Sequence, residues 1–180
     1  MSEFNSPVFL EFESREMASR ALAARLAELL AEAERRNGNA SLVVSGGTSP
    51  VALFHCLREK PLPWHAITVV PSDERDVAPD HPDRNEAMIR RELLSGSAAQ
   101  AELVSLIPPG EIPGHFDAVV LGMGGDGHTA SLFPGSPDLE RALESKNKLE
   151  NMVVPQLGSH RVTLTPLALL STSAVFFLFF

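Results

Sequence analysis

The chain has 180 residues, of which 44% are hydrophobic and 21% are charged, and this length and mixture are typical of one globular domain. The net charge of −8 argues against a nucleic-acid-binding protein and means that any anion site must depend on local donors. The single cysteine, Cys56, cannot form an internal disulfide, and residues 1–13 lack the pattern of a secretory signal, so we expect a cytoplasmic protein.

Hydrophobic patterning alternates between strand and helix along most of the chain. Ser14 is suited to cap a helix that runs to about Arg36 and stops at Asn37-Gly38. Further helices are predicted at residues 50–58, with Pro50 in the first helical position, at 86–94 and at 166–170. Strands are predicted at residues 8–12, 41–45, 67–70, 103–107, 116–121, 152–155, 162–165 and 175–180. This order predicts an α/β fold with a Rossmann-like, mostly parallel sheet flanked by helices, in a single domain over residues 1–180.

The C-terminal stretch, residues 162–180, is mostly apolar and ends in Val-Phe-Phe-Leu-Phe-Phe. A membrane-spanning helix needs about 20 predominantly apolar residues. Thr, Pro and Ser interrupt this stretch, so a buried strand is favoured over a tail anchor. No membrane association is expected.

Three polar segments each follow the carboxyl end of a predicted strand. Ligands bind at that edge of an open parallel sheet, so the segments are expected to converge. The first, residues 45–50, reads Ser-Gly-Gly-Thr-Ser-Pro. Gly46 and Gly47 allow backbone N–H groups to approach a phosphate, while Thr48 or Ser49 is placed to cap the next helix. An ordinary capped turn is the alternative.

The second segment, residues 72–77, reads Ser-Asp-Glu-Arg-Asp-Val. A run of charges is usually a solvated loop, and residues 73–85 are predicted to form one. The functional alternative makes Arg75 a bidentate anion clamp held in place by neighbouring carboxylates. Arg84 and Asn85 are expected to line the same edge.

The third segment, residues 121–135, reads Leu-Gly-Met-Gly-Gly-Asp-Gly-His-Thr-Ala-Ser-Leu-Phe-Pro-Gly. Its clustered glycines indicate unusual dihedral angles or the close approach of a ligand. His128 in such a turn is suited to act as a general base near neutral pH. The glycine spacing also matches a dinucleotide fingerprint, but Asn147 and Lys148 stand where that fingerprint needs an acidic residue.

The third segment closely resembles the signature of the 6-phosphogluconolactonases. Residues 45–50, residues 73–77 and the run Arg-Val-Thr-Leu-Thr at 161–165 occur in that family's order. The related glucosamine-6-phosphate deaminases continue the turn toward Ile-Ala-Phe-Asn-Glu-Pro. Here it continues Thr-Ala-Ser-Leu-Phe-Pro, which favours the lactonase. The resemblance implies hydrolysis of 6-phosphogluconolactone to 6-phosphogluconate in the pentose phosphate pathway, without a metal or organic cofactor.

For that reaction we expect His128 to activate a water molecule, with Asp126 as its orienting or polarising partner. Backbone N–H groups around residues 124–127 are expected to donate to the developing oxyanion. The expected substrate-binding residues are Gly46, Gly47, Thr48, Asp73, Arg75, Gly124, Gly125 and Gly127.

The resemblance also implies a shortened C-terminus. The family usually continues for some tens of residues, with a Gly and a Lys that help to bind the phosphate, whereas this chain stops at Phe180. The C-terminal strand–helix region is therefore expected to be incomplete and its aromatic end partly exposed, in a monomer or weak homo-oligomer. Two alternatives stay open: a non-catalytic sugar-phosphate-binding protein, and a deaminase or isomerase of an amino-sugar phosphate.

Overall fold

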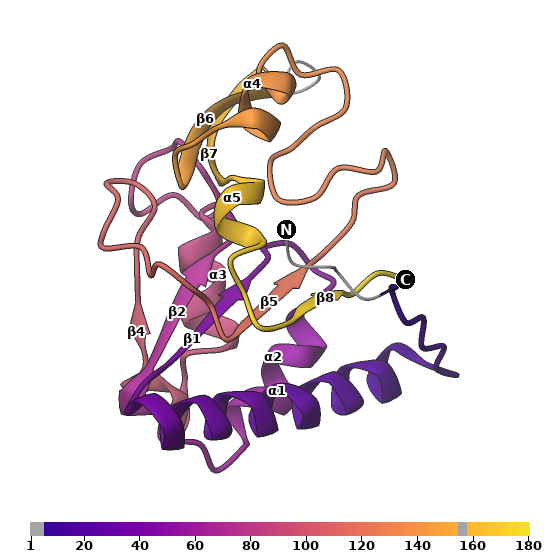
Figure 1. Cartoon of the computed structure of the whole chain (residues 1–180), viewed down its shortest axis with the longest axis vertical. Coiled ribbons are helices and arrows are strands. Elements are labelled where there is room, and N and C mark those ends of the chain that lie inside the picture. Colours follow the sequence, from indigo (N-terminus) through magenta and orange to yellow (C-terminus); the bar gives the residue numbers. More distant parts are fainter. Residues whose placement is uncertain (1–5, 155–157) are drawn as a thin grey trace.

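The computed structural model describes residues 6–154 and 158–180 and contains two β-sheets (Figure 1). The larger sheet has five strands in the order β4-β2-β1-β5-β8, and all of its neighbouring strands are parallel. Its strands are β1 (Ala40–Val44), β2 (Ile67–Pro71), β4 (Glu102–Leu103), β5 (Ala118–Leu121) and β8 (Val175–Phe177). The predicted α/β fold with a mostly parallel sheet is therefore confirmed.

The long N-terminal helix has the predicted ends. Helix α1 (Arg15–Asn37) follows Ser14, whose Oγ accepts a hydrogen bond of 3.2 Å from the backbone N–H of Met17. It stops at Gly38, which has a φ of 76°. The other helices are α2 (Val51–Arg58), α3 (Asn85–Glu92), α4 (Leu139–Glu144), α5 (Pro166–Leu169) and the 3-10 turns η1 (Trp64–Ala66) and η2 (Gly96–Gln100). Helix α4 was not predicted, because its six residues are too few for a periodic pattern.

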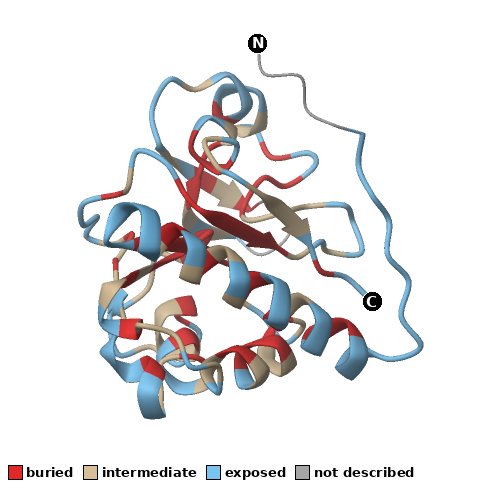
Figure 2. Cartoon of the chain, turned by 60° about the horizontal axis from the view of Figure 1, so that its bottom comes forward, coloured by how far each residue is buried: buried red, intermediate tan, exposed pale blue. Residues whose placement is uncertain are grey.

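Alternate residues of the central strands enter two separate cores. Leu42 and Val44 of β1 pack with the buried residues of α1 and α2, whereas Val43 packs on the opposite face with residues of α5. Figure 2 shows the buried central strands behind helices whose outer faces are exposed. Burial on both faces explains why these strands are continuous apolar runs in the sequence.

The smaller sheet is antiparallel and was not predicted. It consists of β3 (Asp73–Arg75), β7 (Ser159–Leu164) and β6 (Leu149–Val154), with β7 in the middle. Figure 1 shows β6 and β7 at the end of the molecule opposite α1. The prediction that residues 73–85 form a polar loop is wrong at both ends, because residues 73–75 pair with β7 and Asn85 begins α3.

Three further expectations about the elements need correction. Residues 8–12 form no strand, since no neighbouring strand pairs with them, and Val8 and Phe9 are 82% and 80% exposed. Strand β4 stops at Leu103, shortly before the prolines at 108 and 109, which have no N–H to donate. Helix α2 begins at Val51, with Pro50 as its N-cap residue and no side-chain cap from Thr48 or Ser49.

The C-terminal apolar stretch forms the edge of the parallel sheet. Strand β8 ends at Phe177, three residues earlier than predicted, and Phe177, Phe179 and Phe180 are about half exposed. The predicted strand at 152–155 is observed as far as Val154, and Pro155 lies outside the described residues. No helix in the described part of the chain has both the length and the apolar character needed to span a membrane.

Candidate active site

The three polar segments converge at the carboxyl edge of the parallel sheet, as predicted. They follow β1, β2 and β5, and these strands are neighbours in the order β2-β1-β5. The chain winds to opposite sides of β1, and such a switch point opens a crevice at the carboxyl ends of the strands. A Cβ atom on Gly122 would lie 3.6 Å from Ser45 Oγ, and one on Gly46 would overlap the side-chain amide of Asn85. Glycine at position 46 therefore allows its loop to lie against Asn85, and the loops after β1 and β5 lie close together at Ser45 and Gly122.

His128 and Asp126 form a close pair on the turn after β5. His128 Nδ1 lies 2.5 Å from Asp126 Oδ1, and the backbone N–H of His128 donates to the same oxygen at 3.2 Å. The hydrogen bond from His128 lowers the pKa of Asp126 below its ordinary value, so Asp126 is an anion at neutral pH. Phe133 stacks on the imidazole with a centroid distance of 4.0 Å. The ring is thus held at Nδ1 and on one face, which leaves Nε2 for a water molecule or a substrate.

Backbone hydrogen bonds close the turn that carries His128. The N–H of Gly124 donates to His128 O and the N–H of Gly127 donates to Gly124 O, both at 2.9 Å. Gly127 has a φ of 85°, a conformation that favours glycine. These bonds correct the expectation that the whole of residues 124–127 offers donors to an oxyanion. Gly125 keeps that capacity, because its N–H donates to no acceptor within residues 6–154 and 158–180.

The loop after β1 has the open backbone expected of an anion site. Gly47 has a φ of 85°, and Gly47 and Thr48 are both exposed. Because no side chain caps α2, the loop and the first turn of this helix present backbone N–H groups without a competing hydroxyl.

Arg75 is anchored differently from the expectation. Its Nη1 donates to the backbone carbonyl of Asp83 and, at 3.3 Å, to Asn85 Oδ1. The prediction that carboxylates hold its guanidinium is therefore wrong: both acceptors are uncharged. The positive charge of Arg75 is consequently not neutralised by the groups that position it.

Asp73 is the centre of a buried network. It is 4% exposed and accepts hydrogen bonds from Ser131 Oγ at 2.5 Å, from Arg161 Nη1 at 3.3 Å and from Asn85 Nδ2 at 3.3 Å. These bonds connect the loop after β2, the His128 turn and strand β7. Sequence reasoning did not single out Arg161 as a site residue, because its position depends on the antiparallel sheet that the pattern did not reveal.

Glu74 and Arg84 belong to the framework below the site. Glu74 is fully buried and caps α3, accepting from the backbone N–H groups of Asn85 at 2.8 Å and Glu86 at 2.9 Å. Burial raises the pKa of Glu74 above its ordinary value, although the hydrogen bonds and Arg84 act in the opposite direction. Arg84 is 3% exposed and pairs with Glu74 and Glu86, so the expectation that it lines the edge is wrong.

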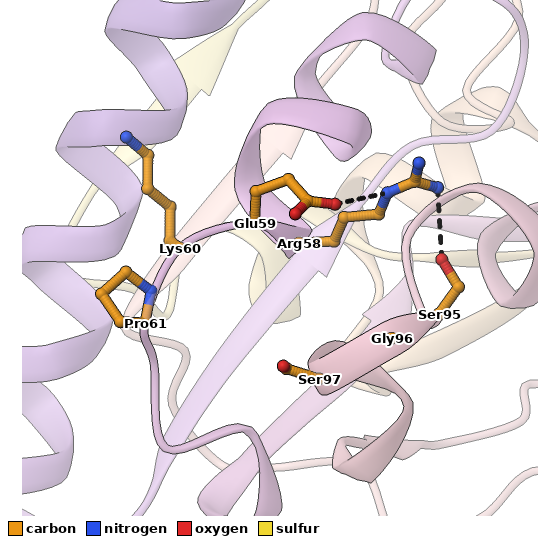
Figure 3. Close-up of a pocket in the computed structure, with 7 residues that line it drawn as sticks. All are labelled: Arg58, Glu59, Lys60, Pro61, Ser95, Gly96 and Ser97. Carbon is orange, nitrogen blue, oxygen red and sulfur yellow. Dashed lines mark hydrogen bonds and ion pairs between the residues drawn. The ribbon is translucent and has the colours of Figure 1, made fainter.

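A surface hollow of about 400 Å³ lies away from the three loops, between the end of α2 and the turn before β4 (Figure 3). Arg58, one of the cations of its lining, already contacts Glu59 at 3.4 Å and Ser95 Oγ at 3.2 Å. The hollow lies toward the amino ends of the strands, and its carboxylate, Glu59, is 77% exposed and pairs with Arg58. The chemistry is therefore assigned to the His128 edge rather than to this hollow.

The fold and the site together define an α/β protein with a His–Asp pair and a glycine-rich loop at the carboxyl edge of a parallel sheet. The family model described as "Glucosamine-6-phosphate isomerases/6-phosphogluconolactonase" matches residues 13–113 and 96–180. The chain belongs to this family.

Individual relatives agree with the family match. The chain is 42% identical over 174 residues to a 6-phosphogluconolactonase of Pseudomonas aeruginosa, with 87% of this chain and 73% of that protein covered. It is 35% identical over 187 residues to one of Neisseria meningitidis, with 94% and 81% covered. The crystal structure of a 6-phosphogluconolactonase from Shewanella baltica superimposes with a TM-score of 0.91 at 34% identity, covering 96% of this chain and 80% of that one.

Proposed function

We propose that this protein hydrolyses 6-phospho-D-glucono-1,5-lactone to 6-phosphogluconate in the cytoplasm, as a step of the pentose phosphate pathway, with His128 as the general base. The observation that supports this most directly is the 2.5 Å contact between His128 Nδ1 and Asp126 Oδ1 at the edge where the three loops meet. An imidazole fixed at one nitrogen by a carboxylate has its other nitrogen oriented for proton transfer. The names of the relatives supply the substrate.

In this mechanism His128 Nε2 accepts a proton from water while the water oxygen attacks the lactone carbonyl carbon. The oxyanion that forms accepts a hydrogen bond from the N–H of Gly125. When the tetrahedral intermediate collapses, the bond between the carbonyl carbon and the ring oxygen breaks, and His128 returns its proton to that oxygen. The carboxylic acid then ionises, so one proton is released for each lactone hydrolysed.

The loop over Gly46, Gly47 and Thr48 holds the phosphate together with Arg75. Its exposed backbone, the uncapped start of α2 and the charge on Arg75 all favour an anion, despite the net charge of −8 on the chain. Gly124 and Gly127 shape the turn below the substrate. Asp73 contributes to substrate binding indirectly, through the side chains of Ser131, Arg161 and Asn85 that it positions.

The test is the rate of acid release from freshly prepared 6-phosphogluconolactone, corrected for spontaneous opening. We expect His128→Ala to lose roughly 10²- to 10⁴-fold in kcat, the usual contribution of a general base. His65→Ala is the matched control, because His65 is exposed at the opposite, amino end of β2. Full activity in His128→Ala would refute the catalytic role.

The same preparation separates the alternatives. A protein that binds 6-phosphogluconate without turnover of the lactone would be a non-catalytic sugar-phosphate-binding protein. Ammonia release from glucosamine 6-phosphate would identify a deaminase.

A further inference from the structure

We propose that Arg161 binds the substrate phosphate, and that Arg161 and Arg75 form a two-guanidinium clamp around a doubly charged phosphate group. This inference rests on the proposed function, which supplies a phosphorylated lactone as the substrate. It adds a phosphate-binding residue from β7, on the smaller sheet, to those of the loops.

The register of the smaller sheet places the two arginines face to face. Arg75 of β3 is paired directly with Arg161 of the antiparallel strand β7. Directly opposed residues in an antiparallel pair project from the same face, with their Cβ atoms about 4.5–5.5 Å apart. Like charges in this arrangement destabilise a sheet unless a counter-charge lies between them.

The counter-charge within the protein is incomplete. Arg75 donates to a backbone carbonyl and to the amide oxygen of Asn85, neither of which is charged. Arg161 has one carboxylate contact, 3.3 Å from Nη1 to Asp73 Oδ2, and that oxygen also accepts the Ser131 hydroxyl. One carboxylate therefore contacts one of the two guanidinium groups and none contacts the other, and a phosphate dianion supplies the missing negative charge.

Arg161 also has unused donor capacity. Its side chain is only 11% exposed, and its Nε is buried without a hydrogen-bond partner among the described residues. A buried donor without an acceptor is costly, whereas a planar guanidinium with several N–H groups matches the oxygens of a phosphate. If Arg161 served only in a structural ion pair, its buried Nε would be expected to have an acceptor.

The clamp lies at a suitable place relative to the base. Phe133 stacks on His128, and the guanidinium carbon of Arg161 lies 5.5 Å from the centroid of the same ring. One aromatic ring thus connects the base and the cation. In a 1,5-lactone phosphorylated on C6, the carbonyl carbon and the carbon that carries the phosphorylated arm are both bonded to the ring oxygen, so the general base and the phosphate clamp must lie near one another.

The experiment compares Arg161→Gln and Arg161→Lys with Arg20→Gln, a charge-matched control on the exposed face of α1. Kinetics are measured on 6-phosphogluconolactone and on unphosphorylated glucono-1,5-lactone. We expect Arg161→Gln to lower kcat/KM for the phosphorylated lactone roughly 10- to 100-fold, mainly through KM, and to lower it much less for the unphosphorylated lactone. Arg161→Lys keeps the charge but lacks the planar guanidinium with its several N–H donors, so we expect an intermediate loss in kcat/KM. Equal losses on both lactones would overturn the proposal.

A binding measurement keeps the clamp testable if the wild type hydrolyses neither lactone and the proposed function fails. The thermal unfolding midpoint is recorded with 6-phosphogluconate, with inorganic phosphate and with gluconate. We expect the two phosphorylated probes to raise the midpoint of the wild type and of Arg20→Gln, and to do so much less in Arg161→Gln. The clamp is wrong if phosphate produces no rise in the wild type, or the same rise in Arg161→Gln.

Discussion

The carboxylates of Glu74 and Asp126 each follow a strand of the parallel sheet, yet they have opposite surroundings. Glu74 is fully buried and accepts backbone N–H groups from Arg75, Asn85 and Glu86, with Arg84 at 3.7 Å. The side chain of Asp126 is 48% exposed, and among the described residues its hydrogen bonds come from the backbone and ring of His128.

This difference separates the framework from the chemistry. Burial raises the pKa of Glu74, whereas the hydrogen bond from His128 lowers the pKa of Asp126. Glu74 fixes the start of α3 and the loop that carries Arg75. Asp126 fixes one imidazole and little else. A substitution of Glu74 should therefore lower the free energy of unfolding, and a substitution of Asp126 should lower kcat.

The largest effect is expected for Glu74→Ala. This change removes the acceptor of three backbone N–H groups and leaves Arg84, which is almost fully buried, with Glu86 as its remaining carboxylate. Breaking a buried ion pair on one side usually costs about 3–5 kcal/mol of stability. We expect a loss of this size in the free energy of unfolding, measured by urea denaturation.

Glu28→Ala is the control for that measurement. Glu28 pairs with Arg25 on the exposed surface of α1, where its side chain is 70% exposed. Such pairs contribute about 0–1 kcal/mol. If the two variants lost similar amounts of stability, the assignment of Glu74 to the framework would be wrong.

A smaller effect, on catalysis alone, is expected for Asp126→Asn. The amide keeps the size of the side chain but removes the charged acceptor of His128, and a hydrogen bond to a charged group contributes about 1.5–3 kcal/mol. We expect kcat for the lactone to fall roughly 10- to 100-fold, with an unchanged unfolding midpoint. Glu28→Gln makes the same change in net charge on α1 and should keep full kcat. A large drop in stability of Asp126→Asn would show that Asp126 belongs to the framework after all.

The comparison also explains what the sequence could reveal. The central strands are buried on both faces, so β1, β2 and β5 are continuous apolar runs, and the loops after them could be expected to meet. The His128 turn is local in sequence, and its pairing with Asp126 spans only two residues. Both features could therefore be predicted from short windows of sequence.

The smaller sheet depends on distant pairing instead. Strand β3 has only three residues, all charged, and its partner β7 lies more than 80 residues later in the chain. No periodic pattern marks such a strand, so residues 73–75 were expected in a polar loop, although they form a strand in which Asp73 and Glu74 are buried. Arg161 was not predicted as a site residue for the same reason, because its position opposite Arg75 depends on the register of β3 and β7.

The smallest expected effect is a pH dependence of the free energy of unfolding that comes from Glu74. Because its pKa is raised in the folded protein, the folded state holds this proton more tightly than the unfolded chain does. The resulting stability is fully present below the ordinary value of 4.5 and is lost as the pH rises through the raised value. Glu74→Gln carries no charge at any pH, so the wild-type free energy of unfolding minus that of the variant should fall over this window and then level off. Urea denaturation of both proteins, from below pH 4.5 to neutrality, measures the difference while the other titrating groups cancel. A difference that grew with pH would mean that the N–H groups and Arg84 outweigh burial, and that the charge on Glu74 stabilises the fold.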